Sequence, residues 1–448
     1  DGIRYRSPSR GLGDVYKRQL AEVTRWIGDM SKGRPGIRHL YLQALINYQK
    51  RQRNNADPLL RAAIERQMAT SFQTFQLKRT DLLFDGTASG RITSRTAMVL
   101  YDQLLADPTD QQWTADPLDA LALLSSPHSS SFDRWFIAAL ERKDILAAVD
   151  IAERCKRRRF LAQLPWGGRL TSLRNLLEDP DGQLPRAAAL QRQQILASFP
   201  IYQELASAGL AIRRQLAQGP IVPDGLVDPG DLAHLYDQWD ETAIERESLL
   251  REIGLQRIPA PILVPPLHPI ATLQKKLAKG SVVVLFHVVR NQLHGFLITG
   301  NNYHHWQLGR AENLRKTIGE LLRLLGNYGP GRNLATEDLV DDRWRNTAHQ
   351  LYHQIFADSR LTLGPTDQLI IVPDGLLWYL PFEVLAPPAL SENQQVLMDH
   401  ALIRYAPTAN LALADNHPLR RVRHTGIVAT QSTPQAVSYT HLTLPTKA

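Results

Sequence analysis

The apolar pattern of this chain changes its period at one place, a proline-rich stretch between residues 258 and 269. Before this stretch apolar residues recur every three or four positions, which predicts helices. After it, β-branched runs of strand length alternate with amphipathic stretches, which predicts an α/β sheet. The stretch itself holds five prolines, which cannot continue a helix. We therefore predict a helical region over 20–255, a linker over 256–280 and an α/β domain over 281–435.

The best organised part of the helical region is a pair of helical patterns, Phe132–Arg142 and Asp144–Leu164, joined at Lys143. A helix-turn-helix of about 34 residues resembles a tetratricopeptide unit. We find no second copy at a fixed period, so a degenerate repeat array and ordinary all-helical packing both stay open. Small residues that would let the two helices approach are Ala138, Ala139, Ala147, Ala148 and Ala152. Further helical patterns run over His39–Gln52, Leu59–Phe75, Ser94–Leu105, Leu184–Leu216 and Asp231–Ile253.

The part beyond the linker reads as strands and helices in alternation. Expected strands are Val282–His287, Leu293–Thr299, Tyr303–Leu308, Gln368–Val372 and His424–Thr430, and expected helices are Ala311–Leu325 and Asp342–Ala357. The predicted fold class is therefore α + α/β, with an all-helical, tetratricopeptide-like region first and an α/β domain second.

The two ends of the chain read as translated sequencing adapter. The codons GAT GTG TAT AAG AGA CAG would encode 14–19, and a frame of their reverse complement encodes 437–441. We therefore interpret 1–19 as an artefactual leader and 436–448 as an artefactual tail. The leader carries five basic and two acidic residues and the tail one lysine, so the formal charge of +8 falls to +4 for the rest. A charge of that size does not call for a nucleic acid partner.

The chain has a single cysteine, Cys155, which excludes an intrachain disulfide framework and a cysteine-cluster metal site. Sparing use of cysteine fits a reducing compartment, and we expect a cytoplasmic location. No apolar run approaches the roughly 20 residues that span a bilayer, so we expect no membrane span.

Cys155 stands directly before the basic run Lys156–Arg159. Nearby positive charge lowers a thiol pKa and could make the thiol reactive. The residue falls mid-helix, however, and no histidine lies within fifteen positions, so we interpret it as a packed thiol. The basic run could touch phosphate, but no aromatic platform accompanies it. We interpret the run as a solvated helix face and do not expect nucleic acid to bind there.

Two histidine pairs could ligate a metal. His349 and His353 share a helix face, but the residues between them include no glutamate and no third ligand is evident. His304 and His305 are neighbours on an expected strand, so their side chains point to opposite faces. We predict no metal site and no cofactor.

Two glycine-containing turns complete the candidates. The segment Gly326–Arg332 is glycine-rich but lacks the Lys-Ser/Thr pair of a phosphate-binding loop, and reads as a surface connection. Asp374 and Gly375 follow a buried strand, where α/β sheets place ligand-binding residues. Pro-Asp-Gly is also a turn-forming sequence, and we interpret it as a turn.

The stretch Leu369–Leu385, in which a strand is followed by Pro-Asp-Gly and then by Leu-Pro-Phe-Glu, resembles the CHAT domain. The Tyr-Ala-Pro after the next strand resembles the same family, and the resemblance covers roughly 280–430. The signature residues, which we assign to the scaffold, are Pro373, Asp374, Gly375, Leu380, Pro381, Phe382, Glu383, Tyr405, Ala406 and Pro407.

The resemblance implies a caspase-like α/β domain, commonly attached to tetratricopeptide repeats, and cysteine peptidase chemistry. The resemblance implies that the catalytic histidine and cysteine follow later strands, in a Thr-His-Gly type turn and a Ser-Ala-Cys type turn. Neither of these turns occurs before residue 435. We therefore assign no catalytic and no binding residue. We expect a parent cysteine endopeptidase that is regulated by protein or peptide partners through the helical region, and an inactive chain as given. The alternative is a non-catalytic protein-interaction scaffold.

Overall fold

The computed structural model describes residues 33–85, 91–180, 182, 184–218, 229–326, 342–364, 367–387, 395–413, 426–429 and 440–443. The chain divides into two compact units, Asp1–Ala412 and Leu413–Ala448. The proposed leader 1–19 and all but the first residue of the loop Gly326–Arg332 lie outside the described residues. The predicted domain limits at 255, 280 and 435 stay predictions.

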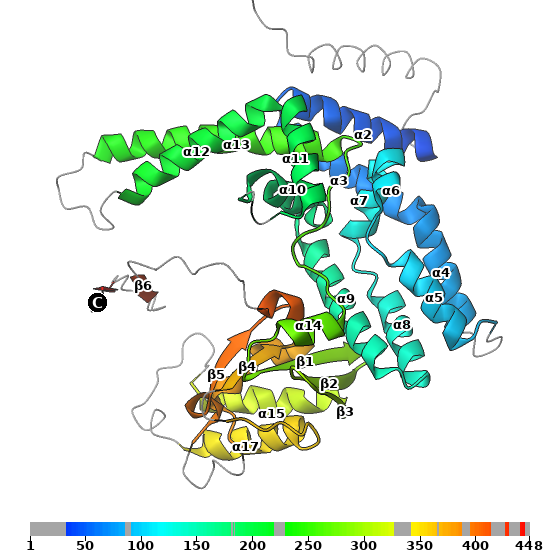
Figure 1. The fold of residues 1–448 in the computed structure, drawn as a ribbon, viewed down its shortest axis with the longest axis vertical. Helices are drawn as coiled ribbons and strands as arrows, with labels where there is room; N and C mark the ends of the chain where they lie inside the picture. Colours follow the sequence, from blue (N-terminus) through cyan, green and yellow to red (C-terminus); the bar gives the residue numbers. More distant parts are fainter. Residues whose placement is uncertain are drawn as a thin grey trace, which may run out of the picture. The chain divides into compact units, whose positions relative to one another are not determined.

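The first part of the chain is helical, as the apolar period predicts (Figure 1). Its helices are α2 (Gly33–Gln49), α3 (Arg53–Thr70), α4 (Phe72–Asp85), α5 (Ser94–Leu104), α6 (Asp110–Ala115), α7 (Pro117–Ser125), α8 (Ser129–Glu141), α9 (Ile145–Gln163), α10 (Arg169–Glu178), α11 (Arg186–Ser198), α12 (Pro200–Gln218) and α13 (Pro229–Leu255), with the 3₁₀ turn η1 (Pro165–Gly168). Side-chain caps explain several starts. Thr109 forms a capping box with Gln112, and Asp116 and Asp144 accept backbone N–H groups of α7 and α9.

Two of the predicted helices are each broken in two, which corrects the prediction. Ser71 is extended, with φ −59° and ψ 132°, so α3 ends before it and α4 begins after it. The stretch Leu184–Leu216 breaks at Phe199, because Pro200 disfavours helical geometry in the residue that precedes it. α11 and α12 are consequently bent by 101°.

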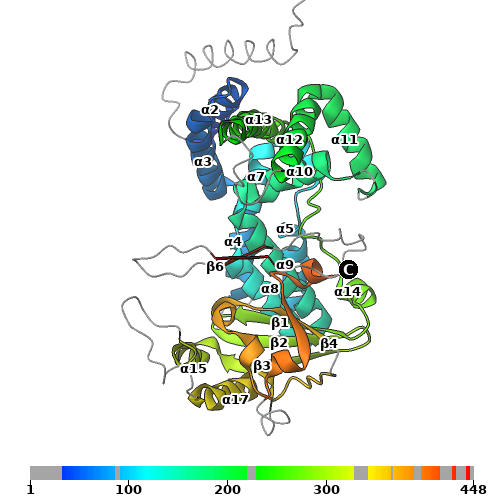
Figure 2. The same cartoon turned by 90° about the vertical axis from the view of Figure 1, so that its left-hand side faces the viewer.

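The second part is a five-stranded mixed sheet of order β3-β2-β1-β4-β5, which confirms the predicted α/β character (Figure 2). β4 pairs in parallel with β1 and β5, whereas β2 pairs antiparallel with β1 and β3. The elements are α14 (Ile270–Lys276), β1 (Ser281–Val289), β2 (Gln292–Ile298), β3 (Tyr303–Arg310), α15 (Ala311–Leu324), α17 (Arg343–Phe356), β4 (Asp367–Val372), β5 (Ala401–Tyr405) and the 3₁₀ turns η3 (Gly375–Tyr379), η4 (Phe382–Val384), η5 (Leu397–Asp399) and η6 (Ala409–Ala412).

Both faces of the sheet are covered within the first unit. One face packs Val284 and Phe286 of β1 against α15 and α17, which contribute Leu314 and Leu351 to the same apolar cluster. On the opposite face Phe136 of α8 lies against rings from β1 and β2. α8 and α9 therefore cover the sheet from the helical region, as Figures 1 and 2 both show.

The second unit contains β6 (Gly426–Ala429) and β7 (Thr440–Thr443), which pair antiparallel. β6 falls within the strand expected over 424–430. Among the described residues no single helix is long and apolar enough to cross a membrane. The pair α11 and α12 meets the length and composition test only when its bent halves are taken together.

Gly295 of β2 lies opposite Trp306 of β3, and the absence of a side chain there makes room for the indole. A Cβ added to Gly295 would lie 2.4 Å from the Trp306 ring. We expect Gly295→Ala to lower the free energy of unfolding by about 1–3 kcal/mol through overpacking. Urea unfolding checks this. Gly319→Ala is the control, because its new Cβ meets nothing within 4 Å. Gly319 lies inside α15, where alanine favours the helix more than glycine does, so this variant should raise the free energy of unfolding by about 0.5–1 kcal/mol.

Candidate functional site: a charged joint between α9 and the sheet

The second half of α9 carries a dense set of charged side chains, and part of this set lies between the helical region and the sheet. Glu153, Lys156 and Arg159 recur every three residues and therefore share one face of the helix. That face meets the carboxyl ends of β1 and β4. We call the set the α9 joint, and its members are Glu153, Lys156 and Arg159 of α9 with His287, Asp374 and Asn410 of the sheet part.

Asp374, directly after β4, is the centre of the joint. Its Oδ1 accepts hydrogen bonds from Arg159 Nη1 at 2.9 Å and from the Gly375 N–H at 3.0 Å. Its Oδ2 accepts the Val288 N–H at 2.9 Å and lies 3.7 Å from Lys156 Nζ. The Asp374 side chain is only 9% exposed, so these contacts replace its water almost completely. Asp374 does shape the turn, as we predicted, but the turn interpretation missed its ion pairs.

Lys156 and His287 complete the contacts around Asp374. Lys156 Nζ donates to the Pro373 carbonyl at 2.7 Å, and its ammonium is buried. His287 Nδ1 lies 3.3 Å from Asp374 Oδ2, and this imidazole is fully buried. Two cationic groups thus converge on one buried carboxylate from the helical region, while a histidine approaches it from β1.

The ionisation of Asp374 follows from these neighbours. Burial by itself raises the pKa of the Asp374 carboxyl. The charge of Lys156 and the contact with His287 outweigh burial, with Arg159 adding to them, and hold this pKa far below its usual range. Burial lowers the pKa of Lys156, although Asp374 partly offsets that effect. Asp374 is therefore a carboxylate at every physiological pH.

Glu153 forms the second half of the joint. Its carboxylate accepts the backbone N–H of Ala409 at 2.8 Å and that of Asn410 at 3.2 Å, at the start of η6. The Asn410 side-chain amide donates to the same carboxylate at 2.9 Å. Burial raises the pKa of Glu153, and the three donors act against that rise because they favour the charged form. α9 therefore holds the loop that follows β5 as well as the end of β4.

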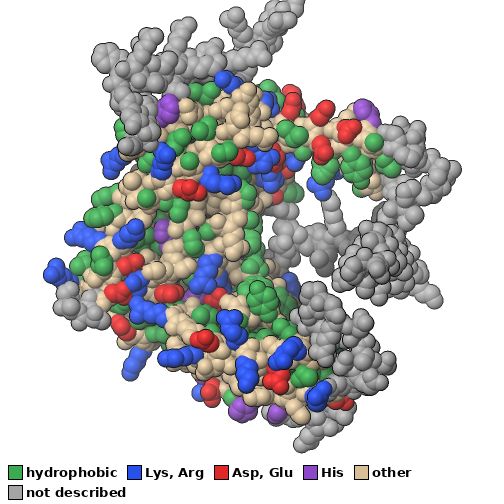
Figure 3. Space-filling view, turned by 180° about the vertical axis from the view of Figure 1, so that it is seen from behind, with side chains coloured by type: hydrophobic (Ala, Val, Ile, Leu, Met, Phe, Trp, Pro, Cys, Tyr) green, Lys and Arg blue, Asp and Glu red, His purple; other side chains and the backbone are tan. Residues whose placement is uncertain are grey.

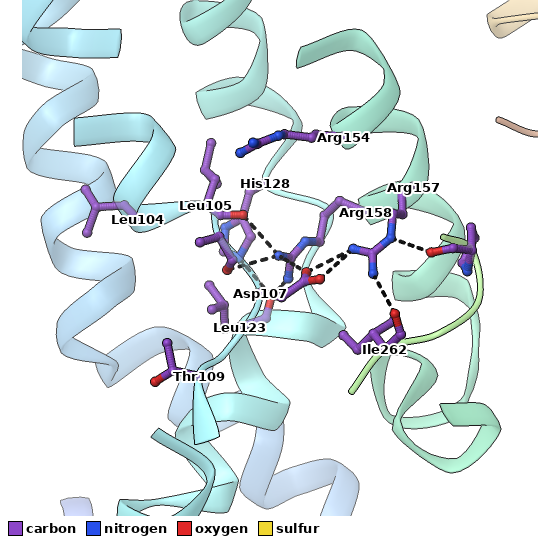
Figure 4. Close-up of polar contacts among 12 residues, drawn as sticks. Leu104, Leu105, Asp107, Thr109, Leu123, His128, Arg154, Arg157, Arg158 and Ile262 are labelled. Atoms are coloured by element: carbon purple, nitrogen blue, oxygen red, sulfur yellow. Dashed lines mark hydrogen bonds and ion pairs between the residues drawn. The ribbon is translucent and has the colours of Figure 1, made fainter. Parts of the chain in front are cut away.

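The rest of the basic run faces the other way, into the helical region (Figure 4). Arg157 donates to both oxygens of Asp107, at 2.7 and 3.0 Å, and to the Pro265 carbonyl of the linker at 2.7 Å. Arg158 donates to the carbonyls of Leu105 and Leu123, each at 3.2 Å. The predicted solvated helix face was wrong, because carbonyl oxygens and carboxylates satisfy these guanidiniums inside the protein. Lys156, Arg157 and Arg158 are buried and so do not present a surface to phosphate.

Cys155 lies between these charges, with 0% of its surface exposed. Burial raises the pKa of the thiol to about 12, and the nearby cations do not reverse that effect. No hydrogen bond or ion pair joins Cys155 to a histidine in the part of the chain that the structure describes. A thiol in this setting packs and does not act as a nucleophile.

Alkylation tests the assignment of Cys155. We expect no reaction of the native chain with iodoacetamide and one equivalent of label after unfolding, since the sequence has one cysteine. The matched probe is a chain with Arg95→Cys, which places a second thiol on an exposed position of α5. That variant should take up one label while folded. Labelling of Cys155 in the native wild type at the rate of the exposed thiol would contradict the assignment.

A stack of histidines lies beside the joint, on the sheet face that Phe136 covers. The Phe136 ring lies 4.8 Å from that of His287 and 5.1 Å from that of His294. His294 Nδ1 is 3.1 Å from His305 Nε2, and His305 stacks on Phe296 at 4.9 Å. Burial, with smaller contributions from His305 and His287, lowers the pKa of His294 to about 4. These rings are therefore neutral packing groups at neutral pH.

The stack predicts an acid-sensitive fold. Between pH 6.5 and about 4 the unfolded chain binds a proton at His294 that the folded chain does not, so the free energy of unfolding falls with pH. Above pH 6.5 both states are neutral at this residue and it contributes nothing. The loss reaches about 3 kcal/mol near pH 4. Urea unfolding of the wild type and of His294→Phe, which keeps an aromatic ring against Phe136, should show a flatter pH slope in the variant.

Gly319→Ala serves as the control for that slope, because it changes stability without altering a titratable group. Parallel pH profiles for the wild type and His294→Phe would show that His294 is not the source of the acid sensitivity.

The two histidine pairs that the sequence offered as metal ligands are not members of the joint. His304 reaches the Asp358 carbonyl at 2.9 Å, whereas its neighbour His305 belongs to the stack. His349 Nδ1 lies 3.0 Å from the Ala386 carbonyl, and His353 is exposed. Within the described ranges no group of three metal-ligating side chains could hold an ion.

Several signature residues after Asp374 pack against one face of the sheet. Phe382 is fully buried and stacks on Phe286 at 5.7 Å, and Leu380 is buried with it. The Tyr405 hydroxyl donates to Glu383 at 2.7 Å and accepts the Phe382 N–H at 3.1 Å. The remaining signature positions lie at the strand ends, where Pro373 and Ala406 are buried, Pro381 and Pro407 are half-buried and Gly375 has φ +55°.

Fold and site together define a protein in which a helical region is docked, through buried ion pairs, on the carboxyl edge of an α/β sheet. The family model of the CHAT domain matches residues 345–446. The chain therefore contains a CHAT domain, a caspase-like family, in its second part. The match includes α17, β4 and β5 and begins after β1–β3, which belong to the same sheet. No curated protein matches the chain.

Proposed function

We propose that the parent protein of this chain is a CHAT-family cysteine endopeptidase that is regulated through its helical region. The observation that carries the proposal is the α9 joint, in which Lys156 and Arg159 of the helical region pair with Asp374 after β4. Sheets of this class place their ligand-binding and catalytic groups at the carboxyl ends of the strands. A helix fixed to that edge is well placed to pass a change in the helical region to the loops there.

The physical basis of such regulation is the energy of the buried ion pairs. A small shift of α9 would break the ion pairs of Asp374 before water could reach the carboxylate, which is strongly unfavourable. The joint therefore favours one arrangement of helix and sheet over intermediate ones. A partner that binds the helical region could shift the balance by acting on α9 or on elements that pack against it, such as α7 and α8.

The proposed chemistry is attack of a thiolate on a peptide carbonyl, with a histidine as its base. Cys155 does not meet the requirements, because it is buried, its pKa is raised and no histidine is bonded to it. The proposed nucleophile is thus not Cys155. We propose that residues 33–413 provide the regulated scaffold of the enzyme.

The test uses the product of the natural gene with a fluorogenic peptide library and a thiol-directed peptidyl probe. We expect cleavage, labelling of a cysteine other than Cys155, and a several-fold change in cleavage in Arg159→Ala. Arg345→Ala, which removes a half-buried arginine of α17 away from the joint, is the matched control and should leave cleavage unchanged. Peptidase activity that is identical in both variants would contradict regulation through the joint.

A non-catalytic scaffold is the second candidate, favoured by one observation. The only thiol of the 448-residue chain is fully buried, so this chain supplies no nucleophilic cysteine. A natural gene product that captures partners through the helical region, yet neither cleaves peptides nor takes the probe, would establish this candidate in place of the peptidase.

A further inference from the structure

The outer face of α4 exposes apolar side chains among positive charges. Phe72, Phe75 and Leu82 are 69%, 60% and 75% exposed, which is unusual for side chains of this size on a folded helix. Lys78 and Arg79 lie on the same side of the helix, because the positions 72, 75, 78, 79 and 82 fall within one third of its circumference. Both cations are exposed, and no ion pair holds either of them among the described residues. We call these five residues the α4 stripe.

The exposed face of α13 also carries apolar side chains among charged ones, but here the charges are negative. Tyr236 and Ile244 are each 57% exposed. Asp240 lies between them on the helix surface, and Asp237 and Glu241 flank them. All three carboxylates are exposed and without an ion pair in the described part of the chain. We call these five residues the α13 stripe.

The two stripes lie well apart in a single molecule. α4 and α13 stand at different ends of the helical region in both ribbon views (Figures 1 and 2). In the view from behind, hydrophobic side chains over α4 and α5 lie among Lys and Arg, whereas those near the end of the α12–α13 hairpin lie among Asp and Glu (Figure 3). Neither stripe is covered by the other within one copy, as their exposure shows.

We propose that the α4 stripe of one copy binds the α13 stripe of a second copy. Each stripe has an apolar pair with charged residues of one sign between its members, and the spacing of the two pairs is alike. Phe75 and Leu82 are about 10 Å apart along the axis, and Tyr236 and Ile244 about 12 Å. Packing the helices together covers both apolar pairs and brings Arg79 to Asp240. Lys78 then faces the flanking carboxylates of α13.

The contact is of the head-to-tail kind, because it joins two different surfaces. Each copy keeps a free α4 stripe at one end and a free α13 stripe at the other, so association continues beyond a pair. One helix on another buries less than the roughly 1,600 Å² of a standard interface. We therefore expect weak association that depends on salt, with oligomers that grow with concentration. This inference is independent of peptidase activity.

Charge reversal in the full chain tests the proposal. Lys78→Glu with Arg79→Glu makes both stripes acidic, and Asp240→Lys with Glu241→Lys makes both basic. All four positions are exposed, so the fold should be retained. By sedimentation velocity up to about 200 µM, a range suited to a small interface, we expect the wild type to associate and each double variant to bind itself at least tenfold more weakly. A 1:1 mixture of the two variants should associate again, because opposite stripes then meet.

Lys275→Glu with Lys279→Glu is the matched control, with the same charge change on an exposed surface near α14. It should associate as the wild type does. A wild type that stays monomeric at the highest concentration would overturn the proposal. So would a reversal that leaves self-association unchanged, or a mixture of the two reversals that does not recover it.

Discussion

Replacing Asp374 by alanine is expected to lower the free energy of unfolding by about 3–5 kcal/mol, the range for removing one partner of a buried ion pair. The loss arises because Lys156 stays buried with its ammonium facing no carboxylate, and because the N–H groups of Val288 and Gly375 lose their acceptor. The pKa of Asp374 is depressed, so its contribution is present above about pH 3.9 and is lost as the pH falls through the folded value. Urea unfolding at neutral pH measures it.

The control for Asp374 is Asp342→Ala at the start of α17. Asp342 pairs with Arg345 at 3.1 Å, but the Asp342 side chain is 69% exposed, and ion pairs at the surface contribute less than about 1 kcal/mol. A companion variant, Lys156→Met, removes the buried cation while filling its volume and leaves Arg159 on Asp374. It should also be destabilising, but less so than Asp374→Ala, because Arg159 still pairs with the carboxylate. If Asp374→Ala, Lys156→Met and the control Asp342→Ala all lowered the free energy of unfolding by the same small amount, the buried pairs would contribute little to stability.

The second large effect is expected at Glu153. Glu153→Ala removes the acceptor of the Ala409 and Asn410 N–H groups and leaves both buried. At about 1–3 kcal/mol for each unsatisfied donor, the free energy of unfolding should fall by about 3–5 kcal/mol. Glu153→Gln keeps one acceptor oxygen but replaces the other by an NH₂ group, which would point at an N–H donor. The stability of this variant should therefore lie between those of the wild type and Glu153→Ala. Thermal or urea unfolding of the series measures the order.

Glu141, at the exposed end of α8, supplies the control for this series. Glu141→Ala should change stability far less than Glu153→Ala, because water replaces the lost contact. If the glutamine and alanine variants of Glu153 were both as stable as wild type, the carboxylate would not be anchoring η6.

The local parts of the fold were predictable because neighbouring residues decide them. The β-branched run of β1 and the apolar period of α8 and α9 depend on residues close in sequence, and both are found where the pattern places them. The breaks at Ser71 and Phe199 were missed because the apolar period continues across them. At Phe199 the following proline was the available signal.

The joint was not predictable from local pattern, because its partners are distant in sequence. Lys156 bonds to a carbonyl 217 residues away, and Glu153 to a backbone N–H 256 residues away. A basic run on an isolated helix is normally solvated, and the run gave no sign that the linker and sheet would cover it. One signal was available in the three-residue spacing of Glu153, Lys156 and Arg159, which places three charges of mixed sign on one helix face.

The central claim is that the charged side chains of α9 make the helical region and the CHAT sheet one cooperative unit. Hydrogen exchange under native conditions, compared between wild type and Asp374→Asn, tests it most directly. We predict that amides of α9, the end of β4 and η6 have the same high opening free energy in the wild type, and that all three lose protection together in the variant. Amides of β4 and η6 that open independently of α9 in the wild type, and that keep their protection when Asp374 is replaced, would contradict it.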